Sequence, residues 1–167
     1  MRALILAADN FEDSELLVPY YRLLEEGIAT DIAAPAKGAI TGVHGYKVEA
    51  TKTFAEVKPG DYDILILPGG RCPETVRLND KALAAAKKMV ESGHVVASIC
   101  HGCQVLISAG VLAGKKATCW KGVRDDLKQA GATYVDEEVV VDGKLITSRW
   151  PADLPAFCRE FMKALKT

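Results

Sequence analysis

Short runs of consecutive apolar residues alternate along the whole chain with segments whose apolar residues recur at helical spacing. The clearest run is Asp-Ile-Leu-Ile-Leu at 63–67, and a nearly continuous apolar run is typical of a strand covered on both faces. We expect further strands at 2–7, 29–34, 95–99, 116–120, 139–141 and 144–147. We expect helices at 12–26, 80–92, 102–109 and 122–130, and from Pro151 onward. This alternation predicts an α/β fold, a mainly parallel sheet sandwiched by helices with right-handed crossovers.

Two segments depart from that alternation. Residues 40–50 place glycines among Val43, Tyr46 and Val48, which predicts a small antiparallel excursion. Asp142-Gly143 separates two short apolar runs and is a hairpin-turn signal. No linker, repeat or low-complexity segment interrupts the 167 residues, so we expect a single domain over 1–167.

The charge balance argues against several classes of partner. A formal net charge of −1, without a run of like charges, gives no field that would attract nucleic acid or anionic lipid. The apolar start, residues 1–8, is followed at once by acidic residues and is too short for a signal core or a membrane span. We therefore expect a cytoplasmic protein with no nucleic-acid or membrane partner.

Five cysteines at irregular spacing argue against a secreted disulfide framework, because such frameworks use even numbers of cysteines. His44 and His94 have no partner at a familiar metal-ligand spacing. We expect neither a metal nor another cofactor.

Three polar or glycine-rich segments follow predicted strands: 10–15, 68–70 and 98–102. Ligands of open parallel sheets bind outside the carboxyl ends of the strands. The coincidence of the three segments at one edge predicts the functional site there, although each segment alone would be a weak signal.

Cys100 stands between a predicted strand and a predicted helix, with the small residues Ser98 and Gly102 nearby. A nucleophile on such an elbow is lifted out of the sheet, and the free amides of the following helix favour its thiolate. The alternative is a buried, inert cysteine, and we favour the reactive one. His101 is the natural acid or base beside it, the alternative being a histidine that caps the helix start.

Gly69 and Gly70 follow Pro68 and could direct backbone amides at a substrate oxyanion, or simply form a tight turn. Glu12 and Glu74 each begin a predicted helical segment. A carboxylate in a first turn complements the helix dipole, so the residues alone favour a structural role for both.

Four motifs carry a family resemblance: Glu12-Asp13, Leu67-Pro68-Gly69-Gly70, residues 97–102 (Ala-Ser-Ile-Cys-His-Gly), and Ser148-Arg149 followed by Pro-Ala-Asp-Leu at 151–154. Over essentially its whole length the chain resembles the PfpI-type intracellular cysteine peptidases of the ThiJ/PfpI superfamily, relatives of the class I glutamine amidotransferases. The resemblance implies a flavodoxin-like three-layer sandwich in which Cys100 is the nucleophile and His101 its partner. It also implies a homo-oligomer, dimer or hexamer, whose active site lies at a subunit interface and takes Glu74 from a neighbouring subunit. Glu12 would lie beside the cysteine sulfur.

Two residues depart from the family pattern. Cys103 stands where relatives usually have proline or another small residue, and it creates a C-x-x-C spacing that could form a disulfide with Cys100. Trp120 stands where close relatives often place a tyrosine near the pocket. Substrate choice is therefore expected to differ from that of the best-known members.

Three functions remain open. The family name favours hydrolysis of peptides by the Cys100 thiolate. The first alternative is glyoxalase or deglycase chemistry on methylglyoxal-type aldehydes, because a thiol adds readily to such carbonyls and an unstrained peptide demands more help for its leaving group. The second is a redox-stress sensor in which Cys103 resolves an oxidised Cys100. A catalytically dead interaction module is the least favoured of all.

Overall fold

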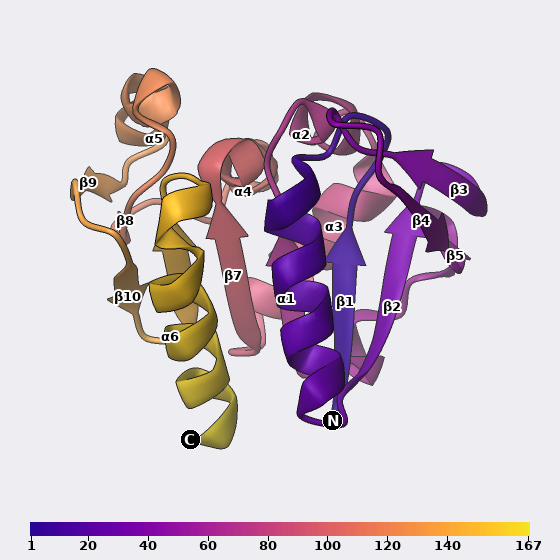
Figure 1. Ribbon diagram of the computed structural model, residues 1–167. Helices are drawn as coiled ribbons and strands as arrows, with labels where there is room; N and C mark the ends of the chain where they lie inside the picture. Colours follow the sequence, from indigo (N-terminus) through magenta and orange to yellow (C-terminus); the bar gives the residue numbers. More distant parts are fainter.

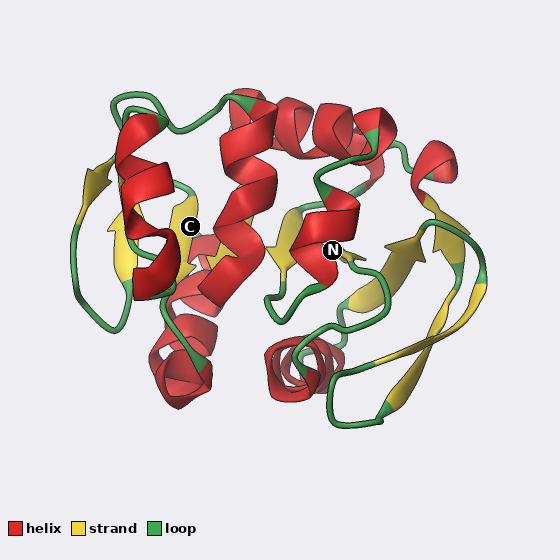
Figure 2. Ribbon diagram, turned by 90° about the horizontal axis from the view of Figure 1, so that it is seen from above, coloured by secondary structure: helices red, strands yellow, loops and turns green.

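In the computed structural model, which describes all 167 residues, a seven-stranded sheet forms the middle layer between two layers of helices (Figure 1, Figure 2). The strand order is β10-β11-β7-β6-β1-β2-β5. Their bounds are β1 (Arg2–Leu6), β2 (Ala29–Ala34), β5 (Lys52–Thr53), β6 (Ile64–Leu67), β7 (Val95–Ile99), β10 (Val140–Asp142) and β11 (Leu145–Ser148). All neighbouring strands pair in parallel except β10 and β11, which form the predicted antiparallel hairpin. The predicted α/β class and the mainly parallel sheet are confirmed.

Two helices cover each face of the sheet. On one face lie α1 (Asp13–Glu25) and α6 (Leu154–Lys166), which contact each other, and on the other lie α3 (Asp80–Glu91) and α4 (Cys103–Ala109). Because both faces are covered, the four residues of β6 are all at most 1% exposed. Each such apolar side chain contributes roughly 1.5–3 kcal/mol by leaving water. No helix is both long and apolar enough to cross a membrane.

The remaining elements are short. The predicted excursion is the antiparallel pair β3 (Gly38–Thr41) and β4 (Lys47–Ala50). The strand expected at 116–120 is only β8 (Lys116–Ala117), which pairs with β9 (Thr133–Tyr134) outside the main sheet, so 118–120 are free to turn toward the site. The helix expected at 122–130 is α5 (Arg124–Gln129), preceded by a 3-10 turn, and a second 3-10 turn at 151–153 precedes α6. The helical opening around Glu74 is the five-residue α2 (Cys72–Val76).

Candidate active site

The loops that follow β1 and β6 are joined by backbone hydrogen bonds at the carboxyl edge of the sheet. The Glu12 N–H donates to the Gly69 carbonyl at 3.0 Å, and the Arg71 N–H donates to the Asn10 carbonyl at 2.8 Å. β7 ends next to β6 at the same edge, so all three predicted segments meet there. This junction positions the candidate residues of the loops that follow β1, β6 and β7.

Cys100 occupies the sharp turn between β7 and α4. Its φ of +61° lies in the left-handed region, which costs a residue with a side chain roughly 1–3 kcal/mol and is found mainly at functional sites. The turn passes close beneath β6, because a Cβ on Gly102 would collide with the Leu67 carbonyl oxygen. The chain thus presents Cys100 at the bottom of a pocket, with 8% of its surface exposed.

His101 contacts the Cys100 sulfur, its Nδ1 atom lying 3.2 Å from Sγ. Burial lowers the pKa of His101, and the nearby Glu74 carboxylate raises it by a smaller amount. The imidazole is therefore neutral at neutral pH and can accept a proton from the thiol. The two neighbours in sequence do face each other, as catalysis requires.

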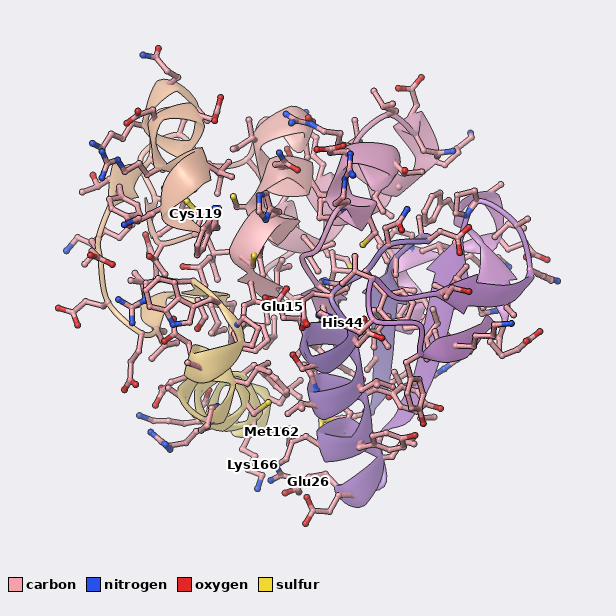
Figure 3. All side chains as sticks on the ribbon, turned by 45° about the horizontal axis from the view of Figure 1, so that its top comes forward. Glu15, Glu26, His44, Cys119, Met162 and Lys166 are labelled. Atoms are coloured by element: carbon pink, nitrogen blue, oxygen red, sulfur yellow. The ribbon has the colours of Figure 1, made fainter.

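Glu15, rather than Glu12, lies against the nucleophile. Its side chain is fully buried, and its Oε2 accepts a hydrogen bond from the Gly69 N–H at 2.8 Å. A Cβ on Gly69 would collide with both that oxygen and Cys100, which places the carboxyl beside the nucleophile. Burial raises the pKa of Glu15 to about 8, against the opposing hydrogen bond from Gly69. In Figure 3 the Glu15 side chain lies near the centre of the view, at the start of α1. The placement of Glu12 beside the sulfur, implied by the family resemblance, is wrong.

The sequence did contain a signal for Glu15. Within α1 it is buried together with Pro19 and Leu23, which follow at intervals of four residues on the same side of the helix. A carboxylate on an otherwise apolar stripe is costly to bury and is a candidate for function for that reason.

Glu12 instead caps the N-terminus of α1. Its Oε2 accepts hydrogen bonds from the Glu15 N–H at 3.0 Å and from the Ser14 hydroxyl. Its Oε1 lies 3.4 Å from Nε2 of His44. Glu12 therefore has a structural task, although it also lines the pocket.

The protonation of Cys100 depends on that of Glu15. Burial raises the pKa of the Cys100 thiol, an ionised Glu15 raises it further, and the N–H groups of His101 and Gly70 lower it. Below about pH 8, the pKa of Glu15, that carboxyl is protonated, so its charge is absent and its O–H can donate to the sulfur. At neutral pH the sulfur can thus receive hydrogen bonds from the two backbone N–H groups and from the Glu15 O–H, which favour the thiolate, but burial outweighs the N–H groups and the pKa of Cys100 stays raised.

The expected oxyanion site needs one correction. The Gly69 N–H is committed to Glu15, so Gly69 has no amide to offer a substrate. The Gly70 and His101 N–H groups both point at the sulfur. When a substrate carbon is bonded to Sγ, the oxygen atom on that carbon would meet these two N–H groups.

Glu74 lies on α2 at the rim of the pocket, exposed to solvent. It is close enough to raise the pKa of His101 in the same chain. A contribution of Glu74 to the site of a neighbouring subunit stays a prediction.

Cys103 is 1% exposed at the start of α4 and does not line the pocket, and the neighbouring Cys119 thiol raises its pKa. All five cysteines are free thiols. A disulfide between Cys100 and Cys103 would require Cys103 to turn away from Cys119, and it stays a prediction for the oxidised protein.

The pocket above the sulfur has a volume of about 300 Å³. It is lined by Glu12, Glu15, Gly70, Arg71, Glu74, Cys100, His101, Trp120, Trp150 and Pro151. Trp120 lines it as expected, and the Trp120 N–H donates to the Cys100 carbonyl at 3.2 Å. Trp150 was not predicted, because nothing in its local sequence shows that the turn before α6 returns to Cys100.

One cluster of side chains has the composition of a metal site. Glu12, Asp13 and His44 each offer a ligand atom, all within 4.8 Å of one another. Both carboxylate oxygens of Asp13, however, accept backbone N–H groups, from His44 and Tyr46, each at 2.9 Å. The cluster therefore fastens the turn between β3 and β4 to the start of α1.

The chain matches the model of the DJ-1/PfpI family over residues 1–164. It is 57% identical to a protein of Pyrococcus abyssi named a deglycase and 56% identical to deglycase PfpI of Pyrococcus furiosus, in each case over 99% of this chain and 100% of the relative. It is 42% identical to the putative cysteine protease YraA of Bacillus subtilis, over 97% of this chain and 96% of the relative. 

Among solved structures, a two-domain protein of Anabaena variabilis with DJ-1/ThiJ/PfpI-like and ferritin-like domains superimposes with a TM-score of 0.97 at 34% identity. The match covers 99% of this chain and 48% of that longer one. DJ-1 of Schizosaccharomyces pombe, at 21% identity and a TM-score of 0.89 over 98% of this chain and 90% of its own, shares the fold. This chain therefore belongs to the DJ-1/PfpI family, and its enzyme relatives make it an enzyme of that family.

Proposed function

We propose that this protein is a deglycase that removes methylglyoxal-type adducts from amino groups, guanidino groups or thiols, with Cys100 as nucleophile. The observation that carries the proposal is the name shared by the two Pyrococcus relatives, which match the chain from end to end at 56–57% identity. The sequence alone favoured peptide hydrolysis over deglycase chemistry, and this proposal reverses that order.

The site supplies each group that the first step needs. The Cys100 sulfur bonds to the adduct carbon that bears the hydroxyl group, and the bond from that carbon to the amine nitrogen breaks. His101, neutral and 3.2 Å from Sγ, takes the thiol proton and passes it to the departing nitrogen. The N–H groups of Gly70 and His101 face the oxygen of the resulting hemithioacetal.

The second step restores the enzyme. The hydrogen on the sulfur-bearing carbon moves to the neighbouring carbonyl carbon as a proton that His101 carries. The proton of the hydroxyl group passes to the carbonyl oxygen, so that the hemithioacetal becomes a thioester of a 2-hydroxy acid. Water then hydrolyses the thioester, releasing the acid and the Cys100 thiol. The net reaction adds one water to the adduct and needs no oxidant or reductant.

The test compares the wild type with Cys100→Ser on the methylglyoxal adduct of Nα-acetylarginine, following free Nα-acetylarginine by NMR. The expected result is release that vanishes in the variant and exceeds the spontaneous dissociation rate of the adduct. Release that never exceeds the spontaneous dissociation rate would show an enzyme that acts only on free methylglyoxal. Release that does not depend on Cys100 would refute the proposal.

Peptide hydrolysis is the second candidate, favoured by the putative cysteine protease at 42% identity. A fluorogenic peptide assayed with the same two proteins decides between them. Cys100-dependent peptide cleavage without adduct turnover would replace the deglycase proposal with the peptidase.

We further propose, on the family resemblance, that the protein is a homo-oligomer. Large apolar side chains that are exposed in the single chain, such as Tyr46 at 50% and Tyr21 at 54%, support such an interface. Sedimentation velocity gives the subunit number, and a monomer at micromolar concentration would overturn the proposal.

A further inference from the structure

One wall of the pocket is aromatic. Trp120 and Trp150 meet edge to face with ring centroids 5.8 Å apart, and the Trp120 indole stacks on His101 at 6.3 Å with an interplanar angle of 27°. Both indoles are half-buried and line the cavity above Cys100. They come from different segments, the turn after β8 and the turn before α6, so only the fold brings them together.

The charged side chains around this wall are mainly carboxylates. Glu12 and Glu74 line the cavity, Arg71 is the one cation there, and His101 is neutral because burial lowers its pKa. An apolar aromatic surface bordered by carboxylates suits a flat organic cation better than a neutral or anionic group.

One of the two indoles already has a guanidinium group on its face. The Arg149 guanidinium lies over the Trp150 ring, 4.6 Å from its centroid. Arg149 donates to both carboxylate oxygens of Asp153, at 2.9 and 3.1 Å, and to Asp136 at 3.0 Å. These bonds fix the guanidinium and, through it, one side of Trp150. The Trp120 indole has no cation against it, and it lines the cavity, where a ligand can reach it.

We propose that Trp120 and Trp150 form a specificity subsite for the guanidinium group of an arginine side chain that carries the aldehyde adduct. The inference rests on the proposed function and narrows its substrate class. A thiol-borne adduct has no cation to place on the indoles. A lysine ammonium is compact and strongly hydrated, whereas a guanidinium is planar and stacks on aromatic faces.

The first experiment measures binding without catalysis. Trp120 and Trp150 are the only two tryptophans of the chain, so intrinsic fluorescence reports on this wall alone. Cys100→Ser is titrated with Nα-acetylarginine amide and with Nα-acetylcitrulline amide, which has a similar shape but no charge. We expect saturable quenching by the arginine compound with a dissociation constant about tenfold lower than for citrulline, as one desolvated cation–π contact gives. Equal responses to both compounds, or none to either, would overturn the subsite.

The second experiment measures selectivity. The ratio of kcat/KM for the methylglyoxal adducts of Nα-acetylarginine and N-acetylcysteine is compared between the wild type and Trp120→Leu. The matched control is Tyr134→Leu, which removes another aromatic ring with a cation near it, Lys128 at 5.9 Å, outside the pocket. We expect the ratio to fall about tenfold in Trp120→Leu relative to the control. A ratio that falls equally in both variants, or in neither, would refute the role of the wall.

The two proposals fail in distinguishable ways. If adduct turnover does not depend on Cys100, the deglycase proposal falls, while the fluorescence titration still decides whether the indoles bind a guanidinium. If turnover depends on Cys100 but citrulline binds as well as arginine, the deglycase stands and only the arginine subsite falls.

Discussion

Replacing Glu15 by Gln should stabilise the protein, and the gain should grow as the pH rises from 5 to 7. In the folded protein burial raises the pKa of Glu15 from 4.5 to about 8. Between these two values the unfolded chain has released the proton that the folded protein retains, so wild-type stability falls by up to about 1.4 kcal/mol per pH unit. Gln is uncharged in both states, escapes this loss, and keeps a carbonyl oxygen for the Gly69 N–H.

The magnitude follows from the two pKa values. At pH 5 the penalty on the wild type is about 1 kcal/mol, and at pH 7 it is about 3.5 kcal/mol. The gain from Glu15→Gln should therefore be about 2.5 kcal/mol larger at pH 7 than at pH 5. Because every other titrating group is present in both proteins, its contribution cancels in this difference of differences. Below pH 4.5 the linkage effect vanishes, and above about 8, the folded-state pKa, it levels off.

Urea denaturation of both proteins at pH 5 and pH 7 measures this quantity. Glu49→Gln is the control, because it makes the same chemical change at an exposed carboxylate. The same Glu15 variant should react more slowly with iodoacetamide at neutral pH, because the amide N–H of Gln is a weaker hydrogen-bond donor to the thiolate than the carboxyl O–H of Glu15. A gain that is equal at both pH values would show that Glu15 is ionised in the folded protein, so that its carboxyl could not donate to the Cys100 sulfur at neutral pH.

Three further outcomes are expected. Gly102→Ala should destabilise the protein by about 2–4 kcal/mol in urea denaturation, because its Cβ meets a β6 carbonyl oxygen, and an unchanged midpoint would contradict the tight turn. Asp153→Asn should lower the free energy of unfolding by about 3 kcal/mol in the same assay, because it weakens a largely buried, bidentate ion pair with Arg149. A loss below about 0.5 kcal/mol would show that the pair is solvated. Brief peroxide treatment followed by mass spectrometry should find Cys100 oxidised and Cys103 reduced, because only Cys100 lines the pocket; a rapid disulfide between them would favour the redox sensor.

The order of strands and helices was predictable because each major element has a strong period of its own. β6 and β7 are fully buried and read as continuous apolar runs, and α3 shows helical spacing between Asn79 as cap and Gly93 as stop. β8 and β9, with two residues each, are too short for any periodicity and depend on pairing with each other. Elements of that size are set by tertiary contacts, which local sequence does not encode.

The site was predictable where its residues belong to a local motif. Cys100 and His101 are adjacent on one elbow, and Gly70 closes the neighbouring loop, so pattern and resemblance located them. Glu15 was missed because its role depends on the direction of a helical side chain. The resemblance rested on the Glu12-Asp13 motif, so Glu12 was expected beside the sulfur instead. Trp150 was missed because its partner Trp120 is thirty positions away in the sequence, and only the closed fold joins them.

The parts of the site differ in what they contribute to stability. Glu15 is buried at a cost that rises with pH, and Cys100 holds a strained backbone angle, so neither is explained by packing. In the proposed reaction Cys100 bonds to the reacting carbon and Glu15 lies beside its sulfur, so any substrate that brings a suitable carbonyl adduct would meet them in the same way. Discrimination among substrates must therefore come from the groups around that carbon. In this chain those groups are two indoles bordered by carboxylates, so the identity of the leaving group, guanidine or thiol, is where this enzyme should differ from relatives that share its nucleophile.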